Sequence, residues 1–247
     1  MLRSIAAGFR TAVGVVVLGI GTLLAATYVF FISLVKPHNM HMERVIQAWS
    51  RMFMKLAPAS LEVRGGEALD PHQQYVFVAN HLSNFDIPAV LLAIPQRIRF
   101  LAKAELFNIP VFSQAMHAVG IIRIDRRAGS AAHAAINEGV AAAREHGYSL
   151  IIFPEGTRSA DGTLHRFKKG AFRIAIASGL AVVPVTIQGT WEVWRPGAKV
   201  FYPGAVTVTI HDPIPVEGMD TTDIDELRNR AHEIVGSVYQ APAAESG

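Results

Sequence analysis

The chain has 247 residues, of which 51% are hydrophobic and 17% are charged. This balance is too apolar for a disordered chain and too mixed for a protein with many membrane spans, and it suits one domain with a short appendage. The absence of cysteine excludes a disulfide framework, a thiolate zinc site and a cysteine nucleophile. The net charge of +3 suits an anionic membrane surface, a phosphorylated substrate or an acidic carrier protein equally well.

The N-terminal segment is the first predicted element, and it is strongly apolar. No charged residue occurs between Thr11 and Val35, whereas Arg10 precedes this run and Lys36 follows it. A helix of this length reaches roughly 38 Å, enough to cross a bilayer or to enter it deeply. A cleaved signal peptide is the alternative, but the run is longer than the apolar region of such a peptide. Because both flanks are basic, the predicted anchor either spans the membrane or enters one leaflet and returns.

A second helix is predicted over residues 40–56. Val45, Trp49 and Met52 recur there at helical spacing, and basic residues lie between them. A basic amphipathic helix that carries a tryptophan is typical of a segment lying in the membrane interface. The alternative is a helix whose apolar face packs against the rest of the protein.

Beyond residue 58, patterns typical of buried strands alternate with patterns typical of helices. Strands are predicted over residues 75–79, 120–125, 148–153, 181–187 and 205–210. Helices are predicted over residues 88–94, 130–147, 167–178 and 222–239. Strands separated by helices indicate an α/β fold with a mixed, largely parallel sheet flanked by helices.

The string Asn80–Asp86 places a histidine and an aspartate five positions apart, directly after the predicted strand 75–79. Active-site crevices of α/β sheets open where strands end. Histidine is suited to accept a hydroxyl proton near neutral pH, and a carboxylate can orient it. On a continuous helix, residues five apart point about 140° away from each other, so His81 and Asp86 can meet only across a turn. The alternative is a strand-end histidine beside an aspartate that caps the next helix.

A second polar string, Phe153–Ser159, follows the predicted strand 148–153 and leaves a glutamate, a threonine and an arginine at the same rim. The planar fork of arginine suits a phosphate, and a hydroxyl with neighbouring backbone N–H groups completes an anion site. Lys103, Arg123 and Arg126 place further cations beside apolar sequence, as binding of a phosphate next to a lipid chain requires. The alternative for each of these residues is a solvated surface charge.

These strings occur in the order of four motif blocks of one enzyme family. They are NHxxxxD at Asn80–Asp86, GIIRIDR at Gly120–Arg126, FPEGTRS at Phe153–Ser159 and VVPV at Val182–Val185. The chain therefore resembles the glycerophospholipid acyltransferases and, among them, bacterial 1-acylglycerol-3-phosphate acyltransferases. The ordered set is specific, although no single block is.

The resemblance implies a role for each matching residue. His81 is the implied general base, and Asp86 is the implied partner that orients it. The implied substrate-binding residues are Lys103, Arg126, Glu155, Gly156, Thr157 and Arg158, with Arg158 as a phosphate ligand. Arg123 stands where the family commonly has an apolar residue, and Pro184 matches a block that is structural.

The implied reaction is direct transfer of an acyl chain from acyl-carrier protein or acyl-CoA to the sn-2 hydroxyl of 1-acylglycerol-3-phosphate, which gives phosphatidate. No metal, cofactor or nucleic acid is expected. A covalent acyl-enzyme is not expected, because the chain has neither a cysteine nor a GxSxG elbow. The alternatives are another lysolipid acceptor such as lyso-ornithine lipid, a lipid esterase, and a non-catalytic adaptor that binds anionic lipid.

The resemblance also implies an arrangement of the chain at a lipid bilayer. Residues 1–57 are expected to form membrane-anchoring helices, residues 58–240 the catalytic domain and residues 241–247 a flexible tail. The implied location is the bacterial inner (cytoplasmic) membrane, with the catalytic domain on the cytoplasmic face. The implied fold is of the glycerol-phosphate acyltransferase type, an α/β domain behind an N-terminal helical anchor.

Overall fold

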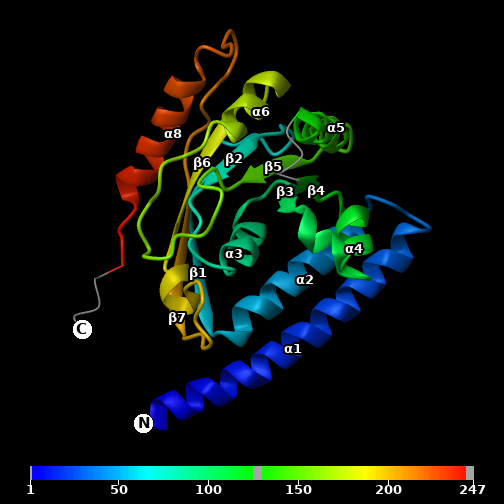
Figure 1. Ribbon diagram of the computed structural model, residues 1–247, viewed down its shortest axis with the longest axis vertical. Coiled ribbons are helices and arrows are strands. Elements are labelled where there is room, and N and C mark those ends of the chain that lie inside the picture. The colour runs from blue at the N-terminus through cyan, green and yellow to red at the C-terminus, as the bar shows by residue number, and fades with distance from the viewer. Residues whose placement is uncertain (1, 125–129, 243–247) are drawn as a thin grey trace.

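A seven-stranded sheet lies at the centre of the computed structural model, which describes residues 2–124 and 130–242 (Figure 1). Its strand order is β1-β7-β6-β2-β5-β3-β4, and every neighbouring pair is parallel except the antiparallel pair of β6 and β7. The strands are β1 (Ala59–Gly65), β2 (Val76–Ala79), β3 (Ile98–Lys103), β4 (Ile122–Ile124), β5 (Ser149–Ile152), β6 (Val182–Gln188) and β7 (Gly204–Ile210). The prediction of a mixed, largely parallel sheet is confirmed.

Helices cover both faces of this sheet (Figure 1). On one face lie α1 (Leu2–Ser33), α2 (Met40–Leu56), α3 (Asp86–Ala93), the 3-10 helix η1 (Ala104–Asn108) and α4 (Phe112–Val119). On the other face lie α5 (Ser130–Glu145), α6 (Gly170–Ser178) and α8 (Ile224–Val238). The short helix α7 (Thr190–Trp194) follows β6 and contacts β7.

The central strand β2 shows why the sheet is buried on both sides. All its residues are buried, and its side chains alternate between two separate apolar cores. Phe77 and Ala79 pack in the core with α2 and α3, whereas Val76 and Val78 pack in the core with α5, α6 and α8. A parallel strand covered on both faces reads as a continuous apolar run, which is the pattern that predicted it.

The structure contains elements that the sequence patterns did not indicate, and β3 is the clearest case. Arg99 interrupts the apolar run of this strand, yet it is only 1% exposed. Its guanidinium forms an ion pair with Glu43 of α2 and lies 3.6 Å from the centre of the Tyr148 ring. A buried charge with such partners is compatible with a strand interior. The elements β1, η1, α4 and α7 were likewise not predicted.

Helix α1 is a candidate membrane anchor that lies along the outside of the molecule (Figure 1). The segment Gly8–Val35 is long and apolar enough to cross a membrane, and only 11% of its most apolar window is buried. Large apolar side chains such as Phe9, Val16 and Leu24 are exposed along it. The N-terminal apolar helix therefore presents a hydrophobic outer surface, which is rare on a soluble monomer.

Helix α2 packs beside α1 and contacts both α1 and α3, while α1 also contacts α4 directly (Figure 1). Its Trp49 donates a hydrogen bond from Nε1 to Oγ1 of Thr22 in α1, over 2.9 Å. Met42 and Met54 are buried, while Arg44 and Arg51 are exposed. Its apolar face therefore packs within the protein, which agrees with the second of the two interpretations of this segment.

Candidate active site

The polar strings of the sequence lie where parallel strands end. His81 follows β2, Glu155 follows β5 and Thr190 follows β6, and these strands are neighbours in the sheet. Because β2, β5 and β6 are parallel, their carboxyl ends share one edge. Asn80 fixes this edge, since its side chain donates to the carbonyl of Ile187 over 2.9 Å and accepts from the N–H of Ile187 over 2.8 Å.

His81 and Asp86 meet across the turn between β2 and α3, as their spacing predicted. Nδ1 of His81 lies 2.7 Å from Oδ2 of Asp86. The same carboxylate oxygen accepts the backbone N–H groups of Leu82 over 2.7 Å and Ser83 over 2.9 Å. Asp86 is the first residue of α3, and its side chain holds the preceding turn in place instead of capping its own helix.

The other oxygen of the Asp86 carboxylate is bound by a residue that sequence reasoning missed. Oγ1 of Thr190 donates to Oδ1 of Asp86 over 2.5 Å, and both side chains are fully buried. Gly189, the preceding residue, has φ of +84°, and a Cβ there would lie 1.9 Å from the carbonyl oxygen of Ala205. A glycine is therefore required at the turn that delivers Thr190 to the site. The sequence signal that could have indicated Thr190 was its position two residues after a buried strand.

The imidazole of His81 is held so that one nitrogen remains for chemistry. Since Asp86 can only accept, Nδ1 carries the proton of the neutral ring and the lone pair is on Nε2. The ring stacks on Phe153 with centroids 4.1 Å apart, and the His81 side chain keeps 17% of its surface exposed. A fixed ring with an accessible basic nitrogen is the arrangement that a general base needs.

Glu155 lies beneath this histidine, and only 4% of it is exposed. Oε1 accepts the backbone N–H of His81 over 2.8 Å, and Oε2 accepts that of His165 over 3.1 Å. Burial raises the pKa of the Glu155 carboxyl to about 7, against the opposing effect of these two hydrogen bonds. Both carboxylate oxygens of Glu155 therefore bind backbone N–H groups at the site. The sequence resemblance implied instead that Glu155 contacts the substrate.

The rest of the second string forms the rim beside His81. Gly156 has φ of +78°, and a Cβ there would lie 2.6 Å from Nζ of Lys168, so this turn accommodates only glycine without displacement. Thr157 is exposed. Arg158 is partly exposed and donates from its guanidinium to Oδ1 of Asn84 over 2.9 Å, which places it over the turn that carries His81 and Asp86.

The remaining predicted residues have different surroundings. Lys103 is exposed at the carboxyl end of β3, which adjoins β5 at the same edge of the sheet. Arg123 is exposed on β4. Pro184 is buried in β6, where it pairs with Val78 of β2. Arg126 lies outside the described residues.

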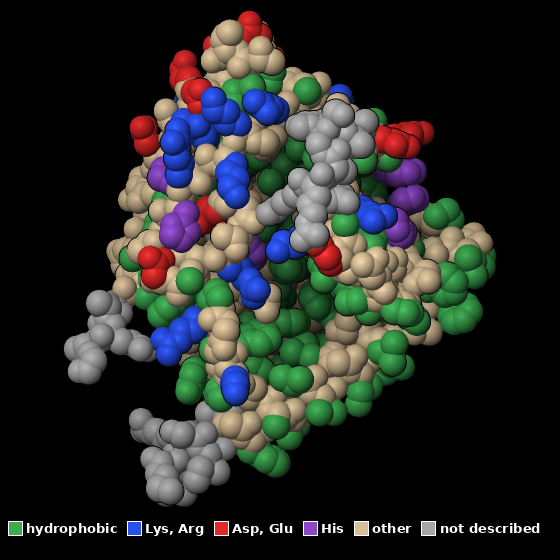
Figure 2. Space-filling view, in the orientation of Figure 1, with side chains coloured by type: hydrophobic (Ala, Val, Ile, Leu, Met, Phe, Trp, Pro, Cys, Tyr) green, Lys and Arg blue, Asp and Glu red, His purple; other side chains and the backbone are tan. Residues whose placement is uncertain are grey.

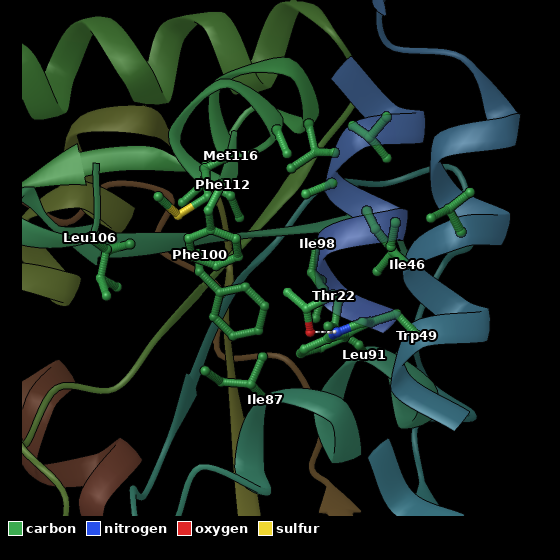
Figure 3. Close-up of a pocket in the computed structure, with 18 residues that line it drawn as sticks. Thr22, Ile46, Trp49, Ile87, Leu91, Ile98, Phe100, Leu106, Phe112 and Met116 are labelled. Atoms are coloured by element: carbon green, nitrogen blue, oxygen red, sulfur yellow. Dashed lines mark hydrogen bonds between the residues drawn. The ribbon is translucent and has the colours of Figure 1, made fainter. Parts of the chain in front are cut away.

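An apolar cavity of about 230 Å³ lies on the face of the sheet that carries α1 and α2. Helices α1, α2, α3 and α4 and strand β3 supply its walls, and Figure 3 shows Trp49, Leu91, Phe100 and Met116 around one space. Phe100 of this wall stacks on Phe153 with centroids 6.2 Å apart, and Phe153 in turn stacks on His81. A hydrophobic cavity therefore begins one ring away from the candidate base.

The site thus combines a histidine–aspartate pair, a cationic rim and a hydrophobic cavity at one edge of an α/β sheet. Within residues 2–124 and 130–242, no group of three or more histidine, cysteine, aspartate or glutamate side chains is placed to hold a metal ion. These features define an enzyme class that activates a hydroxyl group beside an apolar chain. The profile of the acyltransferase family matches residues 60–188, and the chain belongs to that family.

Relatives of this chain share one activity by name. A chloroplastic 1-acyl-sn-glycerol-3-phosphate acyltransferase of Brassica napus is 38% identical over 66% of this chain, and one of Limnanthes alba is 34% identical over 75%. The human alpha enzyme of the same name is 27% identical over 83% of the chain. The alignments cover 47%, 64% and 73% of these relatives, so the chain spans about half to three quarters of their length.

A solved structure agrees with this family membership. The crystal structure of the 1-acyl-sn-glycerophosphate (LPA) acyltransferase PlsC from Thermotoga maritima superposes with a TM-score of 0.79. The two sequences are 26% identical, and the match covers 95% of this chain and 96% of that one. The fold similarity therefore includes nearly the whole chain.

Proposed function

We propose that the protein transfers an acyl chain from a thioester donor, acyl-carrier protein or acyl-CoA, to the sn-2 hydroxyl of 1-acylglycerol-3-phosphate. The observation that carries this proposal is the His81–Asp86 pair, joined over 2.7 Å, beside an apolar cavity. The acyltransferase family and the names of the relatives support the same reaction.

The proposed reaction needs no covalent enzyme intermediate. Nε2 of His81 takes the proton of the acceptor hydroxyl while the hydroxyl oxygen attacks the thioester carbon. A C–O bond forms, the carbonyl electrons move onto oxygen, and Asp86 stabilises the imidazolium. When the oxyanion collapses, the C–S bond breaks and the proton passes from Nε2 to the leaving sulfur. The products are phosphatidate and the free thiol of the carrier, and His81 returns to its neutral state.

The phosphate of the acceptor is assigned to the cationic rim. Arg158 lies over the turn that contains His81, held there by Asn84, and its fork suits two phosphate oxygens. Lys103 ends the neighbouring strand β3 and supplies a second charge. Gly156 and Thr157 form the turn that directly precedes Arg158. Glu155 positions His81 by accepting its backbone N–H. Arg126, which the sequence resemblance also implies, remains part of this proposal.

The acyl chain of the donor is assigned to the apolar cavity. Almost all of the cavity surface is apolar, and its wall at Phe100 is separated from His81 by the ring of Phe153. Burial of a chain in such a cavity contributes about 0.8 kcal/mol per methylene. This binding energy positions the thioester carbon near Nε2, which is where catalysis by proximity requires it.

The site is proposed to work at a membrane surface. Residues 1–57 serve as the anchoring segment in this proposal and residues 58–240 as the catalytic domain, while residues 243–247 of the expected tail lie outside the described residues. The exposed apolar side chains of α1 support contact with lipid. The proposed location is the bacterial inner membrane, with the catalytic domain on the cytoplasmic face.

The test is a transfer assay with purified protein in detergent. It offers the acceptors 1-acylglycerol-3-phosphate, monoacylglycerol and lyso-ornithine lipid, each with acyl-carrier protein and with acyl-CoA as donor. Phosphatidate formation from 1-acylglycerol-3-phosphate alone is expected, because only this acceptor offers a phosphate to Arg158. Equal use of monoacylglycerol would refute the phosphate assignment, and release of free fatty acid without an acceptor would indicate an esterase.

A further inference from the structure

A second cleft borders the active site on the opposite face of the sheet from the apolar cavity. It has a volume of about 490 Å³, within the range of roughly 300–1,000 Å³ typical of small-molecule sites. Its floor is apolar and includes Leu101, Ile152 and Ile174. Phe153, Pro154 and Gly156 also line it, so the cleft reaches the carboxyl end of β5, where Glu155 accepts the backbone N–H of His81.

The position of Phe153 relates the apolar cavity and the second cleft to the reaction. Its ring packs on the α2 and α3 face of the sheet and stacks on Phe100, which lines the apolar cavity, while the residue itself also borders the second cleft at the end of β5. A thioester carbon next to His81 has two substituents, an acyl chain and a sulfur that carries a long arm. If the acyl chain enters the apolar cavity, the arm must leave the carbon in another direction. The second cleft begins beside the thioester carbon, at the residues that follow β5.

The rim of the second cleft is cationic. Lys168 and Arg173 line it, and both side chains are exposed. The backbone N–H of Lys168 donates to the carbonyl of Pro154 over 2.8 Å, and a Cβ built on Gly156 would lie 2.6 Å from its Nζ. The backbone of Lys168 is therefore held at the turn beside His81, and its ammonium lies next to Gly156 of that turn. Among the described residues no carboxylate forms an ion pair with Lys168 or Arg173, whereas Lys169 pairs with Asp225 over 2.7 Å.

The surface supports the same interpretation. Figure 2 shows Lys and Arg side chains gathered around the start of α6, next to recessed hydrophobic side chains. Two exposed polar residues, Asn137 and Thr221, also contribute to the lining of the cleft. An apolar floor, a few hydrogen-bonding groups and cations at the rim suit a slender ligand with amides along its length and a phosphate at its end.

Resting on the proposed function, we propose that this cleft binds the phosphopantetheine arm of the thioester donor, with Lys168 and Arg173 at its phosphate. Acyl-CoA and acyl-carrier protein share this arm, so the cleft serves either donor. It differs from the place assigned to the acceptor phosphate, because Arg158 is directed to Asn84 over the turn of His81. The donor would then lie across the edge of the sheet, with its acyl chain and its arm on opposite faces.

The test compares the variant Lys168→Glu/Arg173→Glu with wild type, and uses palmitoyl-pantetheine, palmitoyl-phosphopantetheine, palmitoyl-CoA and palmitoyl-carrier protein as donors. The donor KM is expected to rise about tenfold or more for the three donors that contain the phosphate, because charge reversal repels it. The KM for palmitoyl-pantetheine and the KM for the acceptor stay at the wild-type values. The control Arg230→Glu changes an exposed charge on α8, away from the cleft, and leaves every KM unchanged.

Each other outcome overturns the assignment. An unchanged KM for palmitoyl-phosphopantetheine would show that Lys168 and Arg173 do not bind the phosphate of the donor. A rise with palmitoyl-carrier protein alone means that the cations recognise the acidic surface of the protein, and a rise with palmitoyl-CoA alone means that they recognise the nucleotide. Failure of the proposed function itself looks different, because wild type would then form no phosphatidate with any donor. The single variants Lys168→Glu and Arg173→Glu, with their melting temperatures, separate loss of binding from loss of folding.

Discussion

Replacing Asp86 by asparagine removes one negative charge from the site with little change in packing. The carboxylate is fully buried, and each of the described groups that hydrogen-bond to it acts as a donor. In Asp86→Asn, the amide oxygen can occupy the place of Oδ2 and accept from His81, Leu82 and Ser83. The amide NH2 group then faces Thr190, whose hydroxyl can accept a hydrogen bond instead of donating one. The fold is therefore expected to remain intact.

The exchange destabilises the transition state, because His81 is an imidazolium there and loses its attraction to the Asp86 carboxylate. Nδ1 lies 2.7 Å from Oδ2, and the centres of the two charges are farther apart. Unit charges roughly 4 Å apart interact by about 4 kcal/mol at an effective dielectric constant of about 20. Because each 1.36 kcal/mol of barrier is about a tenfold change in rate, kcat is expected to fall about a thousandfold.

The assay measures initial rates of phosphatidate formation over a range of donor and acceptor concentrations, together with the melting temperature. Asp86→Asn is expected to lose kcat while both KM values and the melting temperature stay near those of wild type. The control Asp212→Asn changes an exposed carboxylate and is expected to keep full activity. A folded Asp86→Asn protein that retains more than about a tenth of wild-type kcat would refute electrostatic support of His81 by this carboxylate.

Three further predictions follow from the residues around the pair. Thr190→Val removes the hydroxyl that donates to Oδ1 of Asp86 over 2.5 Å, and a hydrogen bond to a charged group contributes about 1.5–3 kcal/mol. This variant is expected to lower kcat about tenfold or more with little change in KM, and Thr190→Ser is expected to restore kcat. An equal loss of kcat in both variants would mean that the packing of the threonine methyl group, and not its hydroxyl, is required. Because burial raises the folded-state pKa of Glu155 from 4.5 to about 7, folded protein binds the proton more tightly than unfolded protein. Its contribution to stability is fully present below pH 4.5 and is lost as the pH rises through about 7, a change of about 3 kcal/mol. Chemical denaturation should show this slope in wild type and not in Glu155→Gln; identical slopes would contradict the assignment. Arg158→Ala is expected to raise the KM for the acceptor roughly tenfold to a hundredfold and to leave the donor KM unchanged, and the reverse pattern would remove Arg158 from the acceptor phosphate.

Much of the fold could be predicted because its buried strands are apolar on both faces. The run at β2 is buried throughout, and the patterns of β5 and β6 were found for the same reason. Strand β3 was missed because Arg99 breaks its apolar pattern, and only the partners Glu43 and Tyr148, which are distant in sequence, explain its burial. Strand β1 was missed because it lies at an edge and is largely exposed.

The candidate site could be predicted only in part. The spacing of His81 and Asp86 correctly required a turn between them, since side chains five residues apart diverge on a helix. Thr190 could not be assigned, because its contact with Asp86 spans more than a hundred positions and depends on strand order. The apolar cavity was also invisible in the sequence, since separate helices and a strand supply its walls. Local patterns do not encode such long-range assembly.

The most direct test of the central claim is the activity of purified His81→Ala with 1-acylglycerol-3-phosphate and a thioester donor. The His81 side chain is partly exposed, and among the described residues it hydrogen-bonds only to Asp86, so its removal should leave the circular dichroism spectrum and the melting temperature close to those of wild type. Without Nε2 no group at this position can take the proton of the hydroxyl, and phosphatidate formation is expected to fall to the background of a reaction without enzyme. Substantial transfer by well-folded His81→Ala protein would contradict the account.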